Sequence, residues 1–418
     1  MRTGWRQCTL GEALTLQRGF DLPERQRRPG TVPVVSSSGV TGWHDTAKVR
    51  APGVVTGRYG TLGDVFYVKE DFWPLNTALY VRDFKGNHPR FIHYLLHYYL
   101  GMLKLAQHNA ASVLPGVNRN ALHRLVVSLP PLPIQRSIAG ILTAYDDLIE
   151  NATRRIANLE ERARLLYDEW FVKFRFPGHE RVRLVESAVG MVPQGWEVRS
   201  LGDICSITMG QSPSSTFYNQ GGNGLPFHQG VSDFGSRFPT DRVYCTLEHR
   251  VAHAGDILFS VRAPVGRLNL SLKKIVIGRG LCAIRSKNEG QRFIFQQLKQ
   301  QFQEEDTIGN GSIFRAVTKD EVYNLKLLWP PSDILCAFDA HLQPIFALLE
   351  SLSRENTALR QTRDRLLPGL VAGEIDVAGR RAGEAPEMAS VLARRVAEAA
   401  GHVEPVGDEG MGWDSLWE

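Results

Sequence analysis

The run PIQRSIAGILTAYDDLIENATRRIANLEERARLLYDEWFVKF, residues 133–174, decides the fold because residues 332–370 repeat its apolar pattern 200 positions later. In both runs the apolar residues recur at alternating intervals of three and four, which is the a/d spacing of a coiled-coil helix. A proline pair precedes each run, Pro130–Pro131 and Pro330–Pro331, and suits a helix start, where a missing amide donor does no harm. The sequence therefore predicts a chain that alternates block, helix, block, helix.

Each predicted helix would expose an apolar stripe if it stood alone, so the simplest arrangement pairs the two helices. A whole block joins the end of one helix to the start of the other, which favours an antiparallel pair with a pseudo-twofold axis. Centred on Ile156 and Asn356, such a pair places Ala152 near Asn356 and Tyr145 near Arg363. The polar members of this seam either fix the register of the helices or mark a frayed, solvated stretch.

The two blocks share a frame but differ in the middle. Trp5 and Gly19 recur 191 positions later as Trp196 and Gly210, whereas the ends of the blocks match at 200 positions. Short β-like runs separated by glycine turns, followed by a helix, predict an α/β block each time and an α+β chain overall. We expect a first block over residues 1–129, a first helix over 130–178, a second block over 179–329, a second helix over 330–376 and a mobile tail over 377–418.

The composition is that of a soluble globular protein, with 418 residues and 43% apolar content. The sequence offers no uninterrupted apolar run of about 18 residues. The N-terminal stretch MRTGWRQCTLGE lacks the apolar core of a signal peptide, so we expect a cytoplasmic protein. The five cysteines are scattered and form no CxxC pair, which favours a reducing compartment without disulfides.

The charge is distributed unevenly along the chain. The formal net charge is +5, while residues 378–418 hold four Arg against eight Asp and Glu. The tail therefore carries −4, and the remaining residues carry +9. A basic body fits a polyanionic partner such as nucleic acid, although charge alone is weak evidence for one.

Two similar blocks at a fixed separation suggest how the chain could recognise duplex DNA. Paired recognition units read half-sites whose separation mirrors the geometry of the protein. Because the middles of the two blocks differ, we expect two unlike half-sites with an uncontacted spacer between them. Such a target is asymmetric and bipartite.

Several strings in this doubled frame resemble the specificity subunit of type I restriction–modification enzymes, over nearly all of residues 5–376. They are LPPLPIQRSIAGIL (129–142), LLYDEWFVKFRFPG (165–178), LPFHQGVSDFG (225–235), GDILFSVRAPVG (255–266), IGRGLCAIR (277–285) and LLPGLVAGEIDV (366–377). The second helix entry, WPPSDIL, departs from the plainer LPP start of the family. The resemblance implies two α/β target recognition domains separated by a long antiparallel two-helix coiled coil.

The resemblance also implies a division of labour. The specificity subunit of this family has no catalysis and no cofactor of its own, binds double-stranded DNA, and recruits two modification subunits that methylate adenine. In the full enzyme it also binds two motor-nuclease restriction subunits. S-adenosylmethionine, ATP and Mg²⁺ are then expected in those partner subunits.

The residues themselves carry no motif for chemistry. Both proline pairs lack the [DNS]PP[YF] context of an amino-methyltransferase, and the sequence has no GxxxxGK[ST] phosphate loop. GRGLCA (278–283) imitates a dinucleotide loop, but a β-like run follows it instead of a helix. Cys245, His249 and His253 lack a clear fourth metal ligand, and DFK (83–85) carries little information as a nuclease signature.

Loops with hydroxyl, amide and cationic residues are the candidates for DNA contacts, because such side chains reach base edges and phosphates. In the first block they are Ser36, Ser37, Ser38, Arg58, Tyr59, Asn76, Thr77, Ser112, Asn118 and Arg119. In the second block they are Ser212, Ser214, His228, Gln229, Arg262, Arg279, Asn310, Ser312 and Arg315. Arg58 and Arg262 are favoured because both follow a β-like run in comparable loops, with a structural ion pair as the chief rival role.

Four aromatic residues near the end of the first helix, Tyr167, Trp170, Phe171 and Phe174, are candidates for docking a partner subunit. Packing against the second block is the equal alternative for these side chains. Two other interpretations of the whole chain stay open. One is an assembly scaffold that binds proteins without touching DNA, and the other is an autonomous nuclease or methyltransferase, against which the missing motifs argue.

Overall fold

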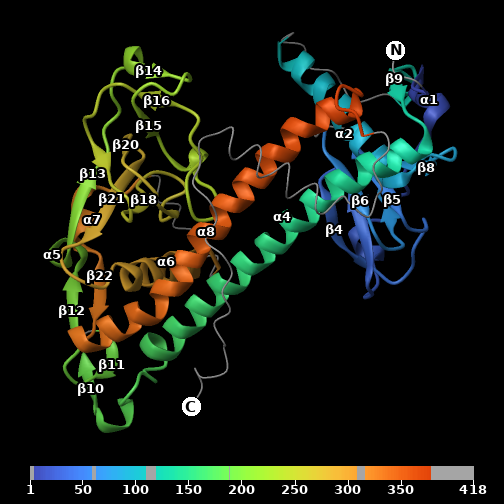
Figure 1. Ribbon diagram of the computed structural model, residues 1–418. Coiled ribbons are helices and arrows are strands. Elements are labelled where there is room, and N and C mark those ends of the chain that lie inside the picture. The colour runs from blue at the N-terminus through green and yellow to red at the C-terminus, as the bar shows by residue number, and fades with distance from the viewer. Residues whose placement is uncertain (1–3, 59–62, 110–118, 188, 308–315, 378–418) are drawn as a thin grey trace. The chain divides into compact units, whose positions relative to one another are not determined.

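A computed structural model describes residues 4–58, 63–109, 119–187, 189–307 and 316–377 (Figure 1). The chain divides into two compact units. Unit 1 combines Met1–Ala152 with Glu355–Glu418, and unit 2 is Thr153–Arg354. Both predicted long helices form, α4 over Leu132–Tyr167 and α8 over Ser332–Val371, and each contributes residues to both units.

The described part of unit 1 combines three small sheets with helices. Its strands are β1 (Arg6–Thr9), β2 (Thr15–Arg18), β3 (Val32–Ser36), β4 (Gly39–His44), β5 (Gly53–Gly57), β6 (Val65–Val68), β7 (Trp73–Pro74), β8 (Ala78–Asp83) and β9 (Val126–Leu129). Its shorter helices are α1 (Leu10–Ala13), the 3-10 turn η1 (Glu24–Gln26), α2 (Pro89–Asn109) and α3 (Arg119–His123). The main sheet has the antiparallel order β2-β8-β5-β6, and the second has the order β4-β3-β7 with β3 parallel to β7. Strand β1 pairs with β9.

The core of unit 1 lies between helix α2 and the main sheet. Helix α2 forms because its apolar residues recur on one face. That face buries Phe91, Ile92 and Leu95 completely, in one cluster with Val54 and Leu79 of the sheet. The sheet is therefore fixed against the helix, and the strand ends are left to carry other side chains.

Unit 2 has the same kinds of elements with a larger second sheet. Its strands are β10 (Leu184–Ser187), β11 (Gly190–Pro193), β12 (Glu197–Ser200), β13 (Cys205–Met209), β14 (Tyr218–Asn219), β15 (Leu225–His228), β16 (Tyr244–Cys245), β17 (Val251–Ala252), β18 (Ile257–Ser260), β19 (Leu268–Leu270), β20 (Ile275–Ile277), β21 (Leu281–Ser286) and β22 (Lys326–Trp329). Its shorter helices are η2 (Asp168–Val172), η3 (His179–Arg181), α5 (Leu201–Ile204), η4 (Ser215–Phe217), η5 (Val231–Asp233), α6 (Gln291–Thr307) and α7 (Lys319–Asn324).

The two units repeat one sheet topology. The order β13-β21-β18-β19 in unit 2 matches β2-β8-β5-β6 in unit 1, and both sheets are antiparallel. In each unit the second sheet contains one parallel strand pair, β3–β7 or β15–β20. The second sheet of unit 2 has five strands against three in unit 1, and residues 221–224 lie between its strands β14 and β15.

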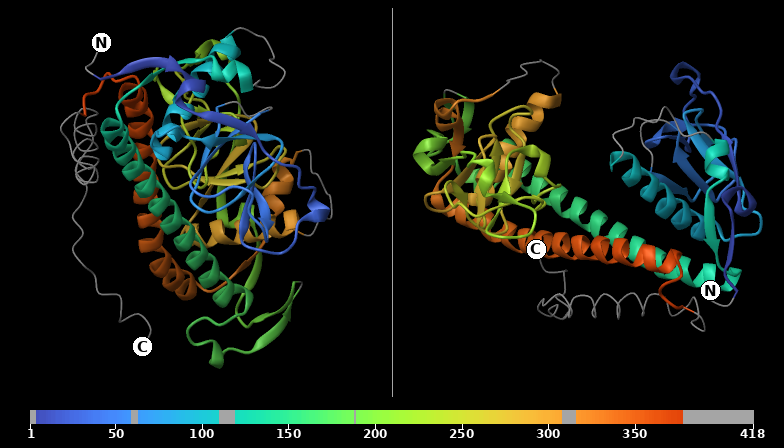
Figure 2. Two further views of the ribbon diagram at one scale, coloured as in Figure 1. Left: turned by 90° about the vertical axis from the view of Figure 1, so that its right-hand side faces the viewer. Right: turned by 90° about the horizontal axis from the view of Figure 1, so that it is seen from above.

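Within each unit a stretch of α4 lies beside a stretch of α8 (Figure 2). In unit 1 the Asp146 carboxylate contacts the Arg363 guanidinium at 2.9 Å. In unit 2 the ring centroids of Tyr167, the last residue of α4, and Phe338 are 6.4 Å apart. A later residue of α4 thus contacts an earlier residue of α8, which is the order expected of an antiparallel pair. The sequence predicted Tyr145 as the neighbour of Arg363, and the residue found there is the next one in α4, Asp146.

Helix α8 is also apolar enough to be noted on its own. Over one window of 18 residues its mean hydropathy is 1.2, so by length and composition alone it could cross a membrane. The sequence-based search for an uninterrupted apolar run missed this window because polar residues interrupt it. In unit 2, Phe338, Leu342 and Leu349 of α8 are fully buried, and 22% of that apolar window is buried.

Candidate nucleic-acid interface

In unit 1 the ends of several strands meet, and most of the described candidates of that unit lie in the sequence at these ends. The strands are labelled in Figure 1. The Leu75 amide donates to Val35 O at 2.8 Å, which places the turn after β3 beside the start of β8. The Arg58 amide, directly after β5, donates to Thr77 O at 3.1 Å. We call this region the strand-end surface of unit 1 and assign to it Arg18, Ser37, Ser38, Arg58, Asn76 and Thr77.

Asn76 is hydrogen-bonded on several sides. Its backbone amide donates to Phe20 O at 3.0 Å, and its side-chain amide donates to the Asp21 carboxylate. The Arg18 guanidinium donates to Asn76 O at 3.2 Å. Arg18 is exposed and was missed by the sequence analysis, although its position before Gly19, a matched glycine of the repeated frame, was a usable signal.

Ser36 is wrong as a DNA-contacting candidate because it is only 7% exposed. Its hydroxyl accepts the Ser38 amide at 3.1 Å and donates to Gly39 O at 3.3 Å, so it closes the turn between β3 and β4. Ser37 is half-buried and Ser38 is exposed. The turn therefore presents Ser37 and Ser38, and Ser36 supports it from inside.

Unit 2 has a corresponding surface at the ends of its strands. The Ser212 hydroxyl donates to Gln229 Oε1 at 2.9 Å and accepts the Arg279 amide at 3.2 Å. The Val261 amide donates to Gly280 O at 3.0 Å, which brings the loop after β18 beside Arg279. We call this region the strand-end surface of unit 2 and assign to it Ser212, Gln229, Arg262 and Arg279. The two arginines in it are exposed, and Ser212 and Gln229 are half-buried.

The backbone hydrogen bonds of the two surfaces correspond. The Gly19 amide donates to Ala78 O at 3.1 Å in unit 1, and the Gly210 amide donates to Leu281 O at 2.9 Å in unit 2. Two further pairs of hydrogen bonds correspond in the same way. The bond from the Leu75 amide to Val35 O matches the bond from the Gly278 amide to His228 O. The bond from the Arg58 amide to Thr77 O matches the bond from the Val261 amide to Gly280 O. By this correspondence Asn76 in unit 1 and Arg279 in unit 2 occupy the same place.

The matched glycines are required by a close approach of the backbone. A Cβ atom on Gly19 would lie 2.3 Å from Leu75 O, and one on Gly210 would lie 2.1 Å from Gly278 O. No side chain fits at such distances, so only glycine permits this crossing of the chain. The repeated glycine of the sequence therefore marks the point where each strand-end surface begins.

His228 is wrong as a DNA-contacting candidate because it is fully buried. Its Nε2 lies 3.2 Å from Asp241 Oδ1, and its Nδ1 lies 3.7 Å from Asp233 Oδ2. Burial alone would raise the pKa of Asp241, but hydrogen bonds from His228 and Lys273 lower it below its ordinary value. His228 thus joins the second sheet to the loop that follows it, and Gln229, the next residue, reaches the surface.

The remaining candidates are placed as follows. Arg119 is exposed at the start of α3. Ser214 is exposed and caps η4 by accepting the Thr216 amide at 3.5 Å. Candidates that lie outside the described residues are Tyr59, Ser112, Asn118, Asn310, Ser312 and Arg315.

The aromatic candidates for partner docking belong to the core of unit 2. Tyr167, Trp170 and Phe171 are at most 6% exposed. The ring centroid of Phe171 lies 5.7 Å from that of Trp196, and the half-buried Phe174 lies 5.4 Å from the same ring. The docking prediction is therefore wrong for Tyr167, Trp170 and Phe171, and the alternative, packing against the second block, is confirmed.

The other motifs considered for chemistry have structural roles. The Cys245 thiol contacts Leu247 O at 3.4 Å, and His249 Nε2 lies 2.8 Å from Gln211 Oε1. The string 278–283 leads into strand β21, as predicted, and not into a helix. Within the described ranges no group of three His, Cys, Asp or Glu residues could hold a metal ion.

The comparison with known families decides the relationship of this chain. The sequence profile described as the type I restriction modification DNA specificity domain matches it twice, over residues 3–161 and 193–367. The chain belongs to this family. Within the specificity family, it is 34% identical over 265 residues to a chain assigned as the type I restriction enzyme MjaX specificity subunit of Methanocaldococcus jannaschii. That match covers 62% of this chain and 62% of the relative.

A second relative of this specificity family is the MjaIX specificity subunit of the same organism, 27% identical over 281 residues. That match covers 64% of this chain and 65% of the relative, so the chain spans less than two thirds of either relative. The S subunit of the type I restriction–modification system of M. genitalium has a similar structure, with a TM-score of 0.59 and 16% identity over 89% of this chain and 97% of that one. The predicted α+β chain with two recognition domains is confirmed at this level.

Proposed function

We propose that this chain is the sequence-specific DNA-binding subunit of a type I restriction–modification complex. In this proposal each unit reads one half of an asymmetric bipartite target through its strand-end surface. The observation that carries the proposal is a shared backbone frame with unlike side chains, Asn76 in unit 1 and Arg279 in unit 2. From the same place, the two side chains offer different hydrogen-bonding groups to a base pair.

The chemistry of both surfaces suits DNA. Arginine matches the two acceptor atoms on the major-groove edge of guanine, and side-chain amides match adenine. Arg262 and Arg279 are exposed in unit 2, and Arg18 is exposed in unit 1. We propose that these residues, together with the described serine, threonine and amide candidates, supply the base and phosphate contacts.

We further propose that α4 and α8 form an antiparallel coiled coil with a pseudo-twofold relation, which sets the spacer between the half-sites. The Asp146–Arg363 and Tyr167–Phe338 contacts support this arrangement. In this scheme the recognition domains are residues 1–129 and 179–329, and the spacer helices are residues 130–178 and 330–376. Val377, at the start of the predicted tail, is only 3% exposed, so the ordered part extends at least to it.

The partners follow from membership of the family. We propose that the chain binds two modification subunits, which methylate adenine with S-adenosylmethionine, and motor-nuclease subunits that use ATP and Mg²⁺. The chain then contributes no catalysis and holds no cofactor. We place the complex in the cytoplasm, where the DNA of the cell is the substrate.

Selection of bound duplexes from a random library tests this function. The chain, purified together with its modification subunits, is expected to enrich sequences with two specified segments separated by an unspecified spacer of constant length. Its affinity for the selected duplex is expected to fall steeply as salt rises, because phosphate contacts release counterions. Assembly with the modification subunits but no enriched sequence would favour the scaffold alternative and contradict the proposal.

A further inference from the structure

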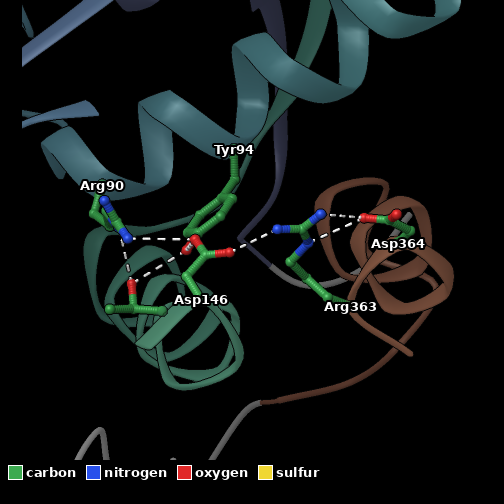
Figure 3. Close-up of polar contacts among 6 residues, drawn as sticks. Arg90, Tyr94, Asp146, Arg363 and Asp364 are labelled. Carbon is green, nitrogen blue, oxygen red and sulfur yellow. Dashed lines mark hydrogen bonds and ion pairs between the residues drawn. The ribbon is translucent and has the colours of Figure 1, made fainter. Parts of the chain in front are cut away.

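A cluster of charged side chains joins three helices of unit 1 around Asp146 of α4 (Figure 3). The Tyr94 hydroxyl of α2 donates to Asp146 Oδ2 at 2.5 Å, and Arg90 Nη2 of α2 donates to the same oxygen at 3.3 Å. Arg363 Nη1 of α8 donates to Asp146 Oδ1 at 2.9 Å. One carboxylate thus accepts hydrogen bonds from two other helices, with a separate oxygen for each helix.

The remaining donors of the cluster are also used within unit 1. Arg90 Nε donates to the Thr143 hydroxyl at 3.1 Å. Arg363 donates to the Asp364 carboxylate from Nε at 3.0 Å and from Nη2 at 2.8 Å (Figure 3). Burial and the Asp146 carboxylate raise the pKa of Tyr94, so its phenol keeps the proton that it donates. The network is therefore closed by side chains that each have a defined partner.

The cluster is partly shielded from water and lies in apolar surroundings. The side chains of Arg90, Asp146 and Arg363 are 14%, 20% and 24% exposed. The neighbours of Asp146 along α4, Tyr145 and Ile149, are at most 5% exposed and belong to the core. A charge at this depth is stable only with its partners in place, so it disfavours every register that separates them.

This property distinguishes the cluster from the apolar residues around it. Apolar side chains pack against one another in several registers, whereas a polar group in a helix seam is satisfied in only one, which is how it selects register. A slip of α8 along α4 by one turn would move Arg363 by about 5.4 Å and break its bond to Asp146. The contacts of Arg90 and Tyr94 extend the same constraint to α2.

We infer that Asp146 is a positioning residue for DNA recognition, which fixes the register of α4 against α8 and the orientation of α2 on both. This inference rests on the proposed function, in which α4 and α8 set the distance between the two half-sites. Asp146 contacts no DNA in this scheme. It determines which spacer length the subunit accepts, and the strand-end surfaces determine which bases it accepts.

The test measures affinity against spacer length for the chain assembled with its modification subunits. Duplexes carry the selected half-sites with the preferred spacer, or with one base pair more or fewer. For Asp146→Asn the preference for the original spacer is expected to fall by about tenfold, equivalent to about 1.4 kcal/mol. Discrimination against single-base changes in either half-site is expected to stay as in the wild type.

Two further variants keep the result interpretable. Asp147→Asn makes the same charge change at the next residue of α4, which is exposed, and is expected to leave the spacer preference unchanged. Arg363→Met removes only the α8 contact and leaves Arg90 and Tyr94 on Asp146, so it replaces Asp146→Asn if that variant does not fold. It is expected to relax the spacer in the same direction.

The outcomes separate the two proposals. A folded Asp146 or Arg363 variant that keeps the wild-type spacer preference would overturn the role of Asp146 and leave the proposed function intact. A variant that loses base discrimination together with spacer preference would also overturn it, since a positioning residue does not read bases. A wild-type complex with no preferred spacer at all would overturn the proposed function itself.

Discussion

The two ends of the α4–α8 helix pair hold together by different chemistry. In unit 1 the helices meet through the ion pair of Asp146 and Arg363 at 2.9 Å, set into an apolar core. In unit 2 they meet through aromatic rings, with Tyr167 of α4 and Phe338 of α8 at a centroid distance of 6.4 Å. Aromatic burial contributes more stability, whereas a shielded ion pair contributes more to register. We therefore infer that the contacts in unit 2 contribute most to the stability of the helix pair, and that those in unit 1 contribute most to its register.

A matched arginine makes a corresponding ion pair in each unit. Arg90 in α2 and Arg292 in α6 stand at the same place, each followed by Phe-Ile. Arg90 Nη2 lies 3.3 Å from Asp146 of α4, and Arg292 Nη1 lies 3.3 Å from Asp339 of α8. Burial raises the pKa of Asp339. In each unit, therefore, a corresponding arginine attaches the block to the long helix that follows it in the chain.

The largest expected effect lies in the aromatic seam of unit 2. Phe338 is fully buried and contacts Phe171, so Phe338→Ala leaves a cavity and is expected to cost about 3–5 kcal/mol of unfolding free energy. Denaturant unfolding measures this loss. Phe217→Ala, at a residue that is 39% exposed, is the control and is expected to change stability by less than about 1 kcal/mol. A comparable loss in both variants would mean that the aromatic seam does not hold unit 2.

His93 of α2 is expected to make the stability of unit 1 decrease in acid. Burial lowers the pKa of His93 to about 3, and its ring lies 4.9 Å from that of Tyr94, centroid to centroid. Since the unfolded chain binds a proton near its ordinary pKa of about 6.5 and the folded ring does not, stability is complete above about pH 6.5 and falls below it. At pH 5 the expected loss from His93 is about 2 kcal/mol.

Urea unfolding at pH 7 and pH 5 checks this expectation. His93→Gln removes the titrating group, so its stability is expected to depend less on pH than that of the wild type. His249→Gln, at an exposed position of unit 2, is the matched control and is expected to keep the wild-type dependence. Equal pH dependence of wild type and His93→Gln would show that the ring does not titrate as a buried group.

The smallest expected effects concern a threonine helix cap that occurs in both units. Thr9 caps α1 in unit 1 and Thr318 caps α7 in unit 2, and in each case the hydroxyl accepts the amide of a glutamate three residues later at 3.3 Å. Thr9→Ala and Thr318→Ala are each expected to cost about 1 kcal/mol, measured by denaturant unfolding. If the two losses differ by more than about 1 kcal/mol, the units differ in their helix caps as well as in their contacts between α4 and α8.

Sequence patterns predicted the elements well because the apolar periods are local. The long apolar repeats became α4 and α8. The sequence placed Arg363 beside Tyr145, and in unit 1 Arg363 contacts the next residue of α4, Asp146. Matched glycines were also visible, and their close backbone contacts explain why they recur.

The sites were harder to predict because they depend on strands far apart in the sequence. Ser36 and His228 lie at the ends of β3 and β15, and nothing local distinguishes their buried side chains from exposed neighbours such as Ser38. The parallel pairing of β3 with β7 and of β15 with β20 decides which side chain turns inward. Arg18 joined the surface only through its bond to Asn76 O.

We propose that each unit reads its own half-site from the same place in a shared frame. The most direct measurement compares Asn76→Ala with Arg279→Ala on duplexes that carry every single-base change in both half-sites. We expect Arg279→Ala to lose about 1–3 kcal/mol of discrimination at one base pair of one half-site. We expect Asn76→Ala to relax one position of the other half-site only. Relaxation of the same half-site by both variants, or a uniform loss of affinity without relaxed specificity, would contradict the account.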